Sequence, residues 1–366
     1  MLSDLDAGGL PVNTAEILTE ATGIAAALDN LAERAEALLA LMQRVIPFEA
    51  GFIALLPPGD HVHVPLSRHG YDDRTNGYLD SPAFLQDLEL GGQRRTRRPV
   101  QHVDSPMPQA EIPVWADYLL PAGFRGALGV ALFTPERRYL GLLGVTTERA
   151  TPTDPAACNL AELLAEQVAV AVDPWRALAT VAGMVHAAAA GIVLTRPGAV
   201  LPLPGLPGHR LLAPGSGVLA AAAAQLAEGG PHTTFLAALP STDGAESQEA
   251  HARITVLAAP PDLRLFAVAV VLVSPAGDLH GLSGRELQLL GLLVTGASNE
   301  RIAVALAITT RTVEVHLEHV RAKLSAHTRT TAAARALRLG LFVPSSLVRL
   351  SAASTWHSSS NGSSPL

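Results

Sequence analysis

The segment from 282 to 343 constrains the fold of this chain most, because it contains four short helical patterns separated by strong end signals. Ser283 is followed three residues later by Glu286, which is a capping box at a helix start. Gly296 tolerates the left-handed conformation that ends many helices, so the first helix is predicted over 284–295. The segment is therefore predicted to fold as a set of short helices.

The second and third predicted helices are joined by a tight turn. Ser298 can cap a helix over 299–306, and Thr309 can cap the next, which continues to about Leu324. Four apolar residues of the third helix form one buried stripe: Val313, Leu317, Val320 and Leu324. The opposite face is mixed: Arg311, Val315, Glu318 and Ala322, flanked by Glu314 and His319. Such a face suits base edges, so a helix-turn-helix is predicted. A fourth helix is expected to end before Gly340.

These residues resemble the C-terminal helix-turn-helix domain of the LuxR family. The shared elements cover all four helices: Glu286, Gly296, Asn299, Ile302, Ala303, Leu306, Thr312, Val313, His316, Lys323, Leu324 and Arg329. The resemblance implies that the third helix recognises DNA. It also implies that six side chains lie near the phosphate backbone: Thr309, Arg311, Thr312, His316, Lys323 and Arg329. The candidate DNA-binding residues are Asn299, Thr309, Thr310, Arg311, Thr312, Glu314, Val315, His316, Glu318, His319, Lys323 and Arg329.

The third helix departs from the family at two positions. Many relatives carry lysine where this chain has Glu314 and Glu318. Acidic groups repel phosphates, but a glutamate can accept a hydrogen bond from cytosine N4. Two interpretations stay open at this stage, a base-reading role and a solvated helix face.

By the same resemblance, the fourth helix is a dimer surface. Its candidate dimerisation residues are Ala332, Ala333, Ala336 and Leu337. Small residues allow close approach of a second helix, but they could equally pack on the first helix of the same domain. A homodimer would bind an inverted repeat with half-sites about one helical turn apart.

Charge separates this segment from the rest of the chain. Residues 281–344 contain eight lysines and arginines against four acids, a net charge of +4, whereas the whole chain carries −7. A basic segment on an acidic chain is typical of a local DNA contact. The one lysine of the chain, Lys323, lies in this segment. A P-loop, a protein kinase or a phosphorylated receiver domain of the usual form needs a lysine elsewhere.

Residues 14–174 have a different pattern. They comprise a helical stretch over 14–45, strands over 48–56 and 61–66, a long irregular segment over 67–123, a hairpin over 126–147 and an amphipathic helix over 154–172. This order resembles a GAF domain, most clearly in the sequence from Tyr139 to Val172. The resemblance implies an α/β sensor domain with an antiparallel sheet and a ligand cavity under the irregular loops. Trp115, Tyr118 and Phe124 could line that cavity or simply pack in the core.

Residues 176–275 are predicted to form a third, undefined α+β unit. Its order, two strands, an alanine-rich helix over 217–227 and three more strands, weakly resembles a PAS domain. The helix-turn-helix domain is assigned to 279–344, and the tail over 351–366 is expected to be disordered. The fold class is therefore multidomain α+β with an all-α C-terminal domain.

Other chemistry finds little support in the sequence. One cysteine, Cys158, excludes a disulfide framework, and as it lies on the closing helix it is no counterpart of the GAF chromophore cysteine. His61 and His63 are two apart on a predicted strand and so share a face, and with His69 or His102 they could bind a metal. No carboxylate or cysteine pattern joins them, so neither metal nor cofactor is expected. No signal peptide or membrane span is predicted, which favours a cytoplasmic location.

The chain is predicted to be a non-enzymatic transcription regulator. Its expected partners are double-stranded DNA, a second copy of the chain, an unknown small ligand and, as a candidate, RNA polymerase. Two alternatives are an interaction adaptor without ligand sensing and an enzyme fused to a DNA-binding tail. A polar-lined cavity in the N-terminal domain would favour sensing over the adaptor.

Overall fold

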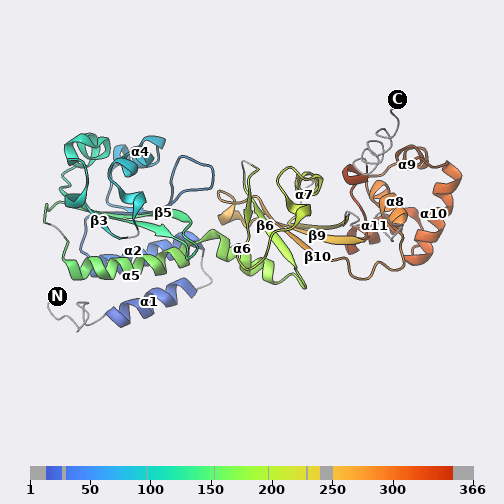
Figure 1. Ribbon diagram of the computed structural model, residues 1–366, viewed down its shortest axis with the longest axis horizontal. Helices are drawn as coiled ribbons and strands as arrows, with labels where there is room; N and C mark the ends of the chain where they lie inside the picture. Colours follow the sequence, from blue (N-terminus) through green and yellow to red (C-terminus); the bar gives the residue numbers. More distant parts are fainter. Residues whose placement is uncertain are drawn as a thin grey trace, which may run out of the picture. The chain divides into compact units, whose positions relative to one another are not determined.

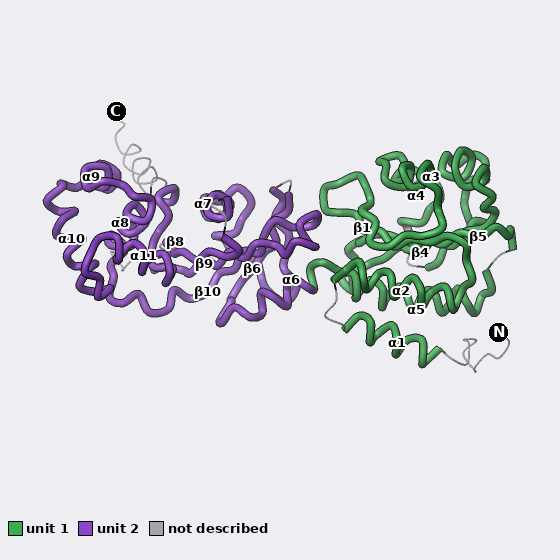
Figure 2. Tube along the Cα trace, turned by 180° about the vertical axis from the view of Figure 1, so that it is seen from behind, with its two compact units in different colours: residues 1–176 green, residues 177–366 purple. Residues whose placement is uncertain are grey.

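The computed structural model describes residues 14–26, 30–96, 98–151, 153–196, 198–227, 230–239 and 250–348. The chain separates into two compact units, residues 1–176 and 177–366 (Figure 2). Residues 1–13 and 240–249, and the tail over 351–366 that was expected to be disordered, lie outside the described residues. Each unit is built around its own antiparallel sheet.

The sheet of the first unit has five strands in the order β2-β1-β5-β4-β3. The strands are β1 Ala50–Leu55, β2 Val64–His69, β3 Val100–Gln101, β4 Gly126–Phe133 and β5 Tyr139–Thr147. The interior strand β1 is buried along its whole length, and the central strand β5 is buried except at its ends. Both faces of the sheet must therefore be covered.

Helices cover the two faces differently (Figure 1). One face is covered by α2 Leu31–Val45 and α5 Pro155–Val172, and α1 Thr14–Ala26 packs on the outer side of these two helices. Above the other face lie the short helices α3 Asp73–Leu79 and α4 Pro82–Leu90 with a π-helix over Val114–Leu119. The irregular segment expected over 67–123 thus contains helices, each too short to show a clear period.

The helix α5 is long and apolar enough by length and composition to cross a membrane. Ten of its residues are nevertheless buried inside the first unit, from Ala156 to Val172. It contacts α1, α2 and β4 through that buried face. These contacts are those of a core helix.

The second unit repeats the strand order of the first. Its sheet has the order β7-β6-β10-β9-β8. In both sheets the order is therefore second, first, fifth, fourth and third strand, counted along the chain within each unit. The strands are β6 Ala190–Leu194, β7 Val200–Pro202, β8 His232–Ala238, β9 His251–Ala258 and β10 Ala269–Pro275. The predicted alanine-rich helix is α7 Gly217–Ala227, and α6 Pro174–Gly183, which the sequence did not predict, precedes β6. Two antiparallel sheets, each with its own helices, therefore precede the C-terminal helices in the sequence.

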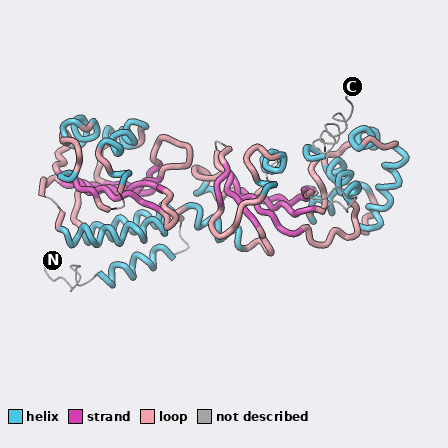
Figure 3. Tube along the Cα trace, in the orientation of Figure 1, coloured by secondary structure: helices cyan, strands magenta, loops and turns pink. Residues whose placement is uncertain are grey.

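Four helices follow this sheet: α8 Gly284–Val294, α9 Asn299–Leu306, α10 Thr310–Lys323 and α11 Arg329–Leu339. Figure 3 shows them at one end of the second sheet. Buried residues of both parts, among them Phe235 of β8 and Leu287 of α8, belong to one continuous hydrophobic cluster. The sequence predicted separate units at 176–275 and 279–344, but here both lie in the unit 177–366.

A short extended segment joins the sheet to the helices. The amide of Leu236 on the edge strand β8 donates to the carbonyl of Phe342 at 2.8 Å, and the amide of Val343 donates to Leu287 at 3.1 Å. Gly291 makes room for this segment, because a Cβ there would lie 1.7 Å from the carbonyl oxygen of Val343. On β9, Arg253 donates from Nη1 to the carbonyl of Leu339 at 2.8 Å. The C-terminal end of α11 is thereby fixed to the sheet.

His63 is buried just before β2, whereas His61 is exposed, so they do not form the alternating strand pair that the sequence suggested. The ring of His63 is 2% exposed, and its Nε2 lies 3.0 Å from the hydroxyl of Tyr139. Burial, and secondly the charge of Arg94, lowers the pKa of His63 from 6.5 to about 4. The folded protein therefore holds this ring neutral.

We predict that the first unit loses stability as the pH falls from about 6.5 to about 4, by up to about 3 kcal/mol. In this window the unfolded chain binds a proton at His63 that the folded chain does not. The loss should be absent in His63→Gln and present in the control His61→Gln. Urea denaturation at several pH values measures it. Equal pH profiles for the wild type and His63→Gln would contradict the assignment.

Candidate nucleic-acid interface and ligand cavity

The α9-turn-α10 element is fixed by caps at both helix starts. The hydroxyl of Ser298 accepts from the amide of Arg301 at 3.3 Å, and that of Thr309 accepts from the amide of Thr312 at 3.1 Å. Between the helices Ala307 is left-handed, with φ of 54°. The capping box predicted at Ser283 is also present, so these local predictions are confirmed.

The orientation of α10 follows from its apolar stripe. Val313, Leu317, Val320 and Leu324 are 0%, 8%, 0% and 5% exposed. These residues lie on one face and hold the opposite face outward. The outward side chains include Arg311, Glu314, Val315 and Glu318, all of which are exposed. The structure thus brings these four candidates together on one accessible helix face, whereas His319, also exposed, lies at its edge toward α8.

Charge on this face is partly paired. The guanidinium of Arg311 lies 3.5 Å from a carboxylate oxygen of Glu314, with side chains that are 85% and 50% exposed. Such a solvated pair is worth little and can be broken by a competing partner. Arg311 is therefore available to a phosphate or a base edge, and Glu314 weakens the positive field beside it.

A buried ion pair fixes α10 to α8. The ammonium of Lys323 lies 2.9 Å and 2.7 Å from the two carboxylate oxygens of Glu286, which is 3% exposed. One of these oxygens also accepts from the amide of Ser283 at 2.7 Å. Burial by itself would raise the pKa of Glu286, but the bonds from Lys323 and Ser283 outweigh it and hold that pKa below the usual value.

Lys323 and Arg329, two of the residues expected to contact phosphate, bind groups of the protein itself. Lys323 is engaged by Glu286 because a buried carboxylate requires a cation. Arg329 donates to the carbonyl of Ala297 at 2.7 Å and lies 3.5 Å from the side-chain oxygen of Asn299. These bonds fix the start of α11 to the start of α9. Both side chains therefore already hold helices of this domain together, independently of any contact with DNA.

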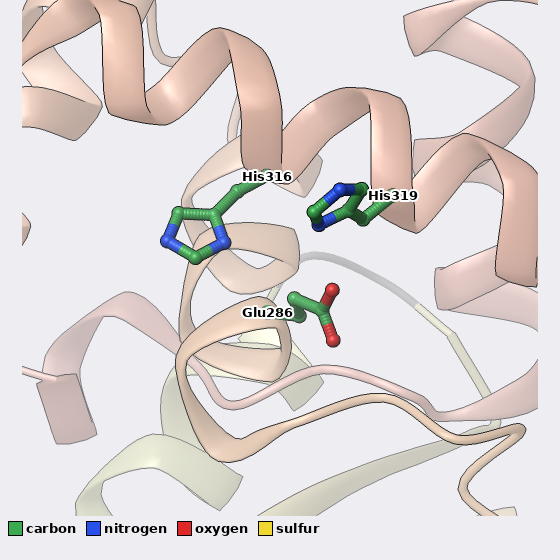
Figure 4. A group of neighbouring side chains, drawn as sticks. All are labelled: Glu286, His316 and His319. Atoms are coloured by element: carbon green, nitrogen blue, oxygen red, sulfur yellow. The ribbon is translucent and has the colours of Figure 1, made fainter.

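Glu286 also lies beside two histidines of α10. His316 and His319 point toward it, and single ligand atoms of the three residues lie within 4.8 Å of one another (Figure 4). Such a group could hold a metal ion. However, both oxygens of Glu286 already accept from Lys323, so an ion would have to displace the ammonium of Lys323 from a buried carboxylate. The arrangement favours the ion pair over metal binding.

The four candidate dimerisation residues on α11 are not equivalent. Ala332 and Ala336 are 0% exposed and belong to the core cluster of the second unit, and Ala333 is partly buried against it. Buried side chains cannot contact a second copy of the chain. These alanines therefore pack within their own unit, which is the alternative to dimerisation that the sequence left open. Leu337 is 51% exposed and remains as the apolar candidate on the surface of this helix.

A cavity of about 70 Å³ lies in the first unit, between the sheet and the segment that carries α3 and α4. Its walls include four aromatic rings, those of Phe52, Tyr71, Phe84 and Trp115. Its polar lining comes from Asp87, Gln93, His102, Ser105 and Thr146. Of the three aromatic residues that the sequence singled out for the cavity, Trp115 lines it.

Two polar groups of the lining have defined partners. The carboxylate of Asp87 is 4% exposed, and its Oδ2 accepts from the hydroxyl of Tyr78 at 2.8 Å and from the amide of Val114 at 2.7 Å. Burial raises the pKa of Asp87 in spite of these two bonds. Nδ1 of His102 accepts from the amide of Ala127 at 3.3 Å, so the neutral ring carries its proton on Nε2.

Sequence reasoning missed Asp87 because it placed the residue in an irregular segment. One signal could have found it. Ser81 followed by Pro82 is a helix start, and Phe84 and Leu88 then supply an apolar spacing of i and i+4 around Asp87. An acid between two apolar positions of a short helix is a candidate for a buried carboxylate.

Comparison with known proteins agrees with both sites. Residues 280–336 match the family model of bacterial regulatory proteins of the luxR family, and residues 29–173 match that of the GAF domain. A stretch of 56 residues, 15% of this chain, is 45% identical to a putative HTH-type transcriptional regulator, YhjB, of Escherichia coli strain K12. The chain spans 28% of the length of that curated relative.

Solved structures are similar only remotely. The GAF domain of a phosphoenolpyruvate-protein phosphotransferase from Coxiella burnetii is 18% identical, with a TM-score of 0.37 over 47% of this chain and 98% of that domain. SdiA of Escherichia coli is 14% identical, with a TM-score of 0.33 over 90% of this chain and 98% of its own.

The class of both sites follows from the matched family models and the geometry. Residues 280–336 are a LuxR-type helix-turn-helix domain, and residues 29–173 are a GAF domain. The second sheet lies between these two domains in the sequence. This confirms the family resemblance and the mixed α+β fold class that the sequence predicted.

We predict that Lys323→Ala lowers the free energy of unfolding of the second unit by about 2–4 kcal/mol, because Glu286 is left as a buried, unpaired carboxylate. The contribution of the pair is present at neutral pH and is lost as the pH falls through the depressed pKa of Glu286. Urea denaturation measures both effects. The control Arg301→Ala, at an exposed position on α9, should change stability by less than about 0.5 kcal/mol. Equal stability of the two variants would show that the ion pair does not hold α10.

Proposed function

We propose that this protein is a transcription regulator that binds double-stranded DNA through α10 and responds to a small ligand in the cavity of its GAF domain. The observation that carries the DNA part is the mixed, exposed face of α10, held outward by a fully buried stripe on the other side. A helix presented in this way fits the major groove, where side chains reach base edges.

The N-terminal cavity favours a regulator that is controlled by a ligand over an interaction adaptor that senses none. Its lining combines aromatic walls with a few polar groups, which is the usual composition of small-molecule sites. An adaptor that only dimerises has no need of a cavity with a buried carboxylate. RNA polymerase is proposed as a further partner on the strength of the class of regulator alone.

Arg311 is proposed to make the principal specific contact. It is 85% exposed near the start of α10, and Arg binds guanine through two hydrogen bonds in the major groove. Val315, one turn further along the same face, is 39% exposed and suits contact with a thymine methyl group. Glu314 and Glu318 are proposed to accept from cytosine rather than to contact phosphate.

We predict that Arg311→Ala weakens binding to the preferred site by about 1–3 kcal/mol, or about 5- to 150-fold. The site is first selected from a random pool of duplex DNA with the full-length protein. Fluorescence polarisation then compares it with a scrambled duplex. The matched control is Arg338→Ala, which removes the same charge from α11 and should affect both duplexes equally. Loss of selectivity in Arg338→Ala alone would reject α10 as the recognition helix.

Dimerisation is proposed to involve the exposed part of α11. Leu337 is its most exposed large apolar side chain, at 51% against 37% for Leu339, whereas Ala332 and Ala336 support the helix from inside. One recognition helix reads only a few base pairs, so two copies on an inverted repeat would double the contacts.

We predict that Leu337→Glu reduces loading on the selected site from two copies to one and weakens binding, because a carboxylate would enter an apolar contact. Sedimentation of the protein–DNA complex measures the number of copies. Met184→Glu, at a position that is 80% exposed on the same unit, is the control and should leave two copies bound. Two copies of Leu337→Glu bound with wild-type affinity would rule out this surface.

A further inference from the structure

The charge of the GAF cavity restricts what it can bind. Among the described residues that line it there is no arginine or lysine, and Asp87 is the one carboxylate. The nearby cations Arg68 and Arg94 are already paired, Arg68 with Asp80 at 2.6 Å and Arg94 with Glu89. A negatively charged ligand in this cavity would therefore lie beside the carboxylate of Asp87, with no arginine or lysine among the described lining residues.

The carboxylate of Asp87 is only half satisfied. Both of its hydrogen bonds, from Tyr78 and from Val114, end on Oδ2. Within the described part of the chain, Oδ1 has no hydrogen-bond partner, yet it is not one of the fully buried atoms that lack one, so it is open to the cavity that Asp87 lines. A donor on a ligand in this cavity can therefore bond Oδ1 without displacing a protein group.

The aromatic walls favour the same kind of ligand. Phe52 contacts Tyr71 and Phe84 edge to face, with ring centroids 6.2 Å and 6.0 Å apart, and Trp115 completes the lining. The faces of such rings attract cations, most strongly when water is excluded. Gly144 allows this packing, since a Cβ there would lie 2.5 Å from the ring of Phe52.

We propose that the GAF cavity binds a small aromatic or aliphatic amine, whose ammonium group bonds Oδ1 of Asp87 while its apolar body lies against the aromatic walls. The cavity volume of about 70 Å³ is several times that needed for one water, which restricts the ligand to a small molecule. This inference rests on the proposed function, because it names the ligand class of the same sensor site.

Three probes of similar size and different charge test the inference: benzylamine, benzyl alcohol and benzoate. We predict that calorimetry on the full-length protein at neutral pH ranks them in that order, with benzylamine at least about tenfold tighter than benzoate. Asp87→Asn should weaken benzylamine about tenfold or more and leave benzyl alcohol unchanged. Unchanged binding of benzyl alcohol also shows that the variant cavity is folded. Asp117→Asn, which removes a nearby exposed charge outside the lining, is the control and should retain the wild-type ranking.

Two readouts separate this inference from the proposed function. Equal affinity for all three probes, tighter binding of benzoate, or no binding of any probe at millimolar concentration would overturn the amine assignment. DNA affinity, measured with and without saturating benzylamine, tests control separately. Selective binding of benzylamine with unchanged DNA affinity would support the ligand class and contradict regulation through this cavity.

Discussion

The ion pair between Glu286 and Lys323 is the interaction on which the proposed DNA-binding surface depends. It joins the first turn of α8 to the last turn of α10, with the carboxylate buried and the lysine side chain 34% exposed. The removal of the carboxylate from water is tolerated only with a cation and the amide of Ser283 as partners. The pair thus fixes one end of α10 to α8, while the apolar stripe of α10 directs its polar face outward.

A second constraint acts on the other end of the helical domain. The segment around Phe342 adds to the edge of the second sheet and packs on α8, and Arg253 holds the carbonyl of Leu339. An exposed strand edge is an open set of donors and acceptors, and here the chain covers part of it with its own backbone. The helices and the second sheet therefore share one core, and a change in the sheet would reach α11 directly.

The two sheets have the same strand order, yet in the described residues they are covered by different elements. The first sheet is overlaid by α3, α4 and a π-helix, which leave the aromatic cavity beneath them. Aromatic residues make up only 4% of the chain, and four of them line this one cavity. That concentration, together with one buried carboxylate, makes the first sheet the better candidate for a sensor.

The sequence by itself determined the helical domain almost to the residue, because caps, a tight turn and one apolar stripe are local signals. It also determined β4, β5 and α7, whose patterns are long and uninterrupted. The tertiary structure alone decided the partner of Lys323, the burial of Ala332 and Ala336, and the site of Asp87. The first and the last of these depend on a residue distant in the chain, Glu286 for Lys323 and Val114 for Asp87. A pattern of neighbours in sequence contains no information about such partners, since packing brings them together only when the fold is complete.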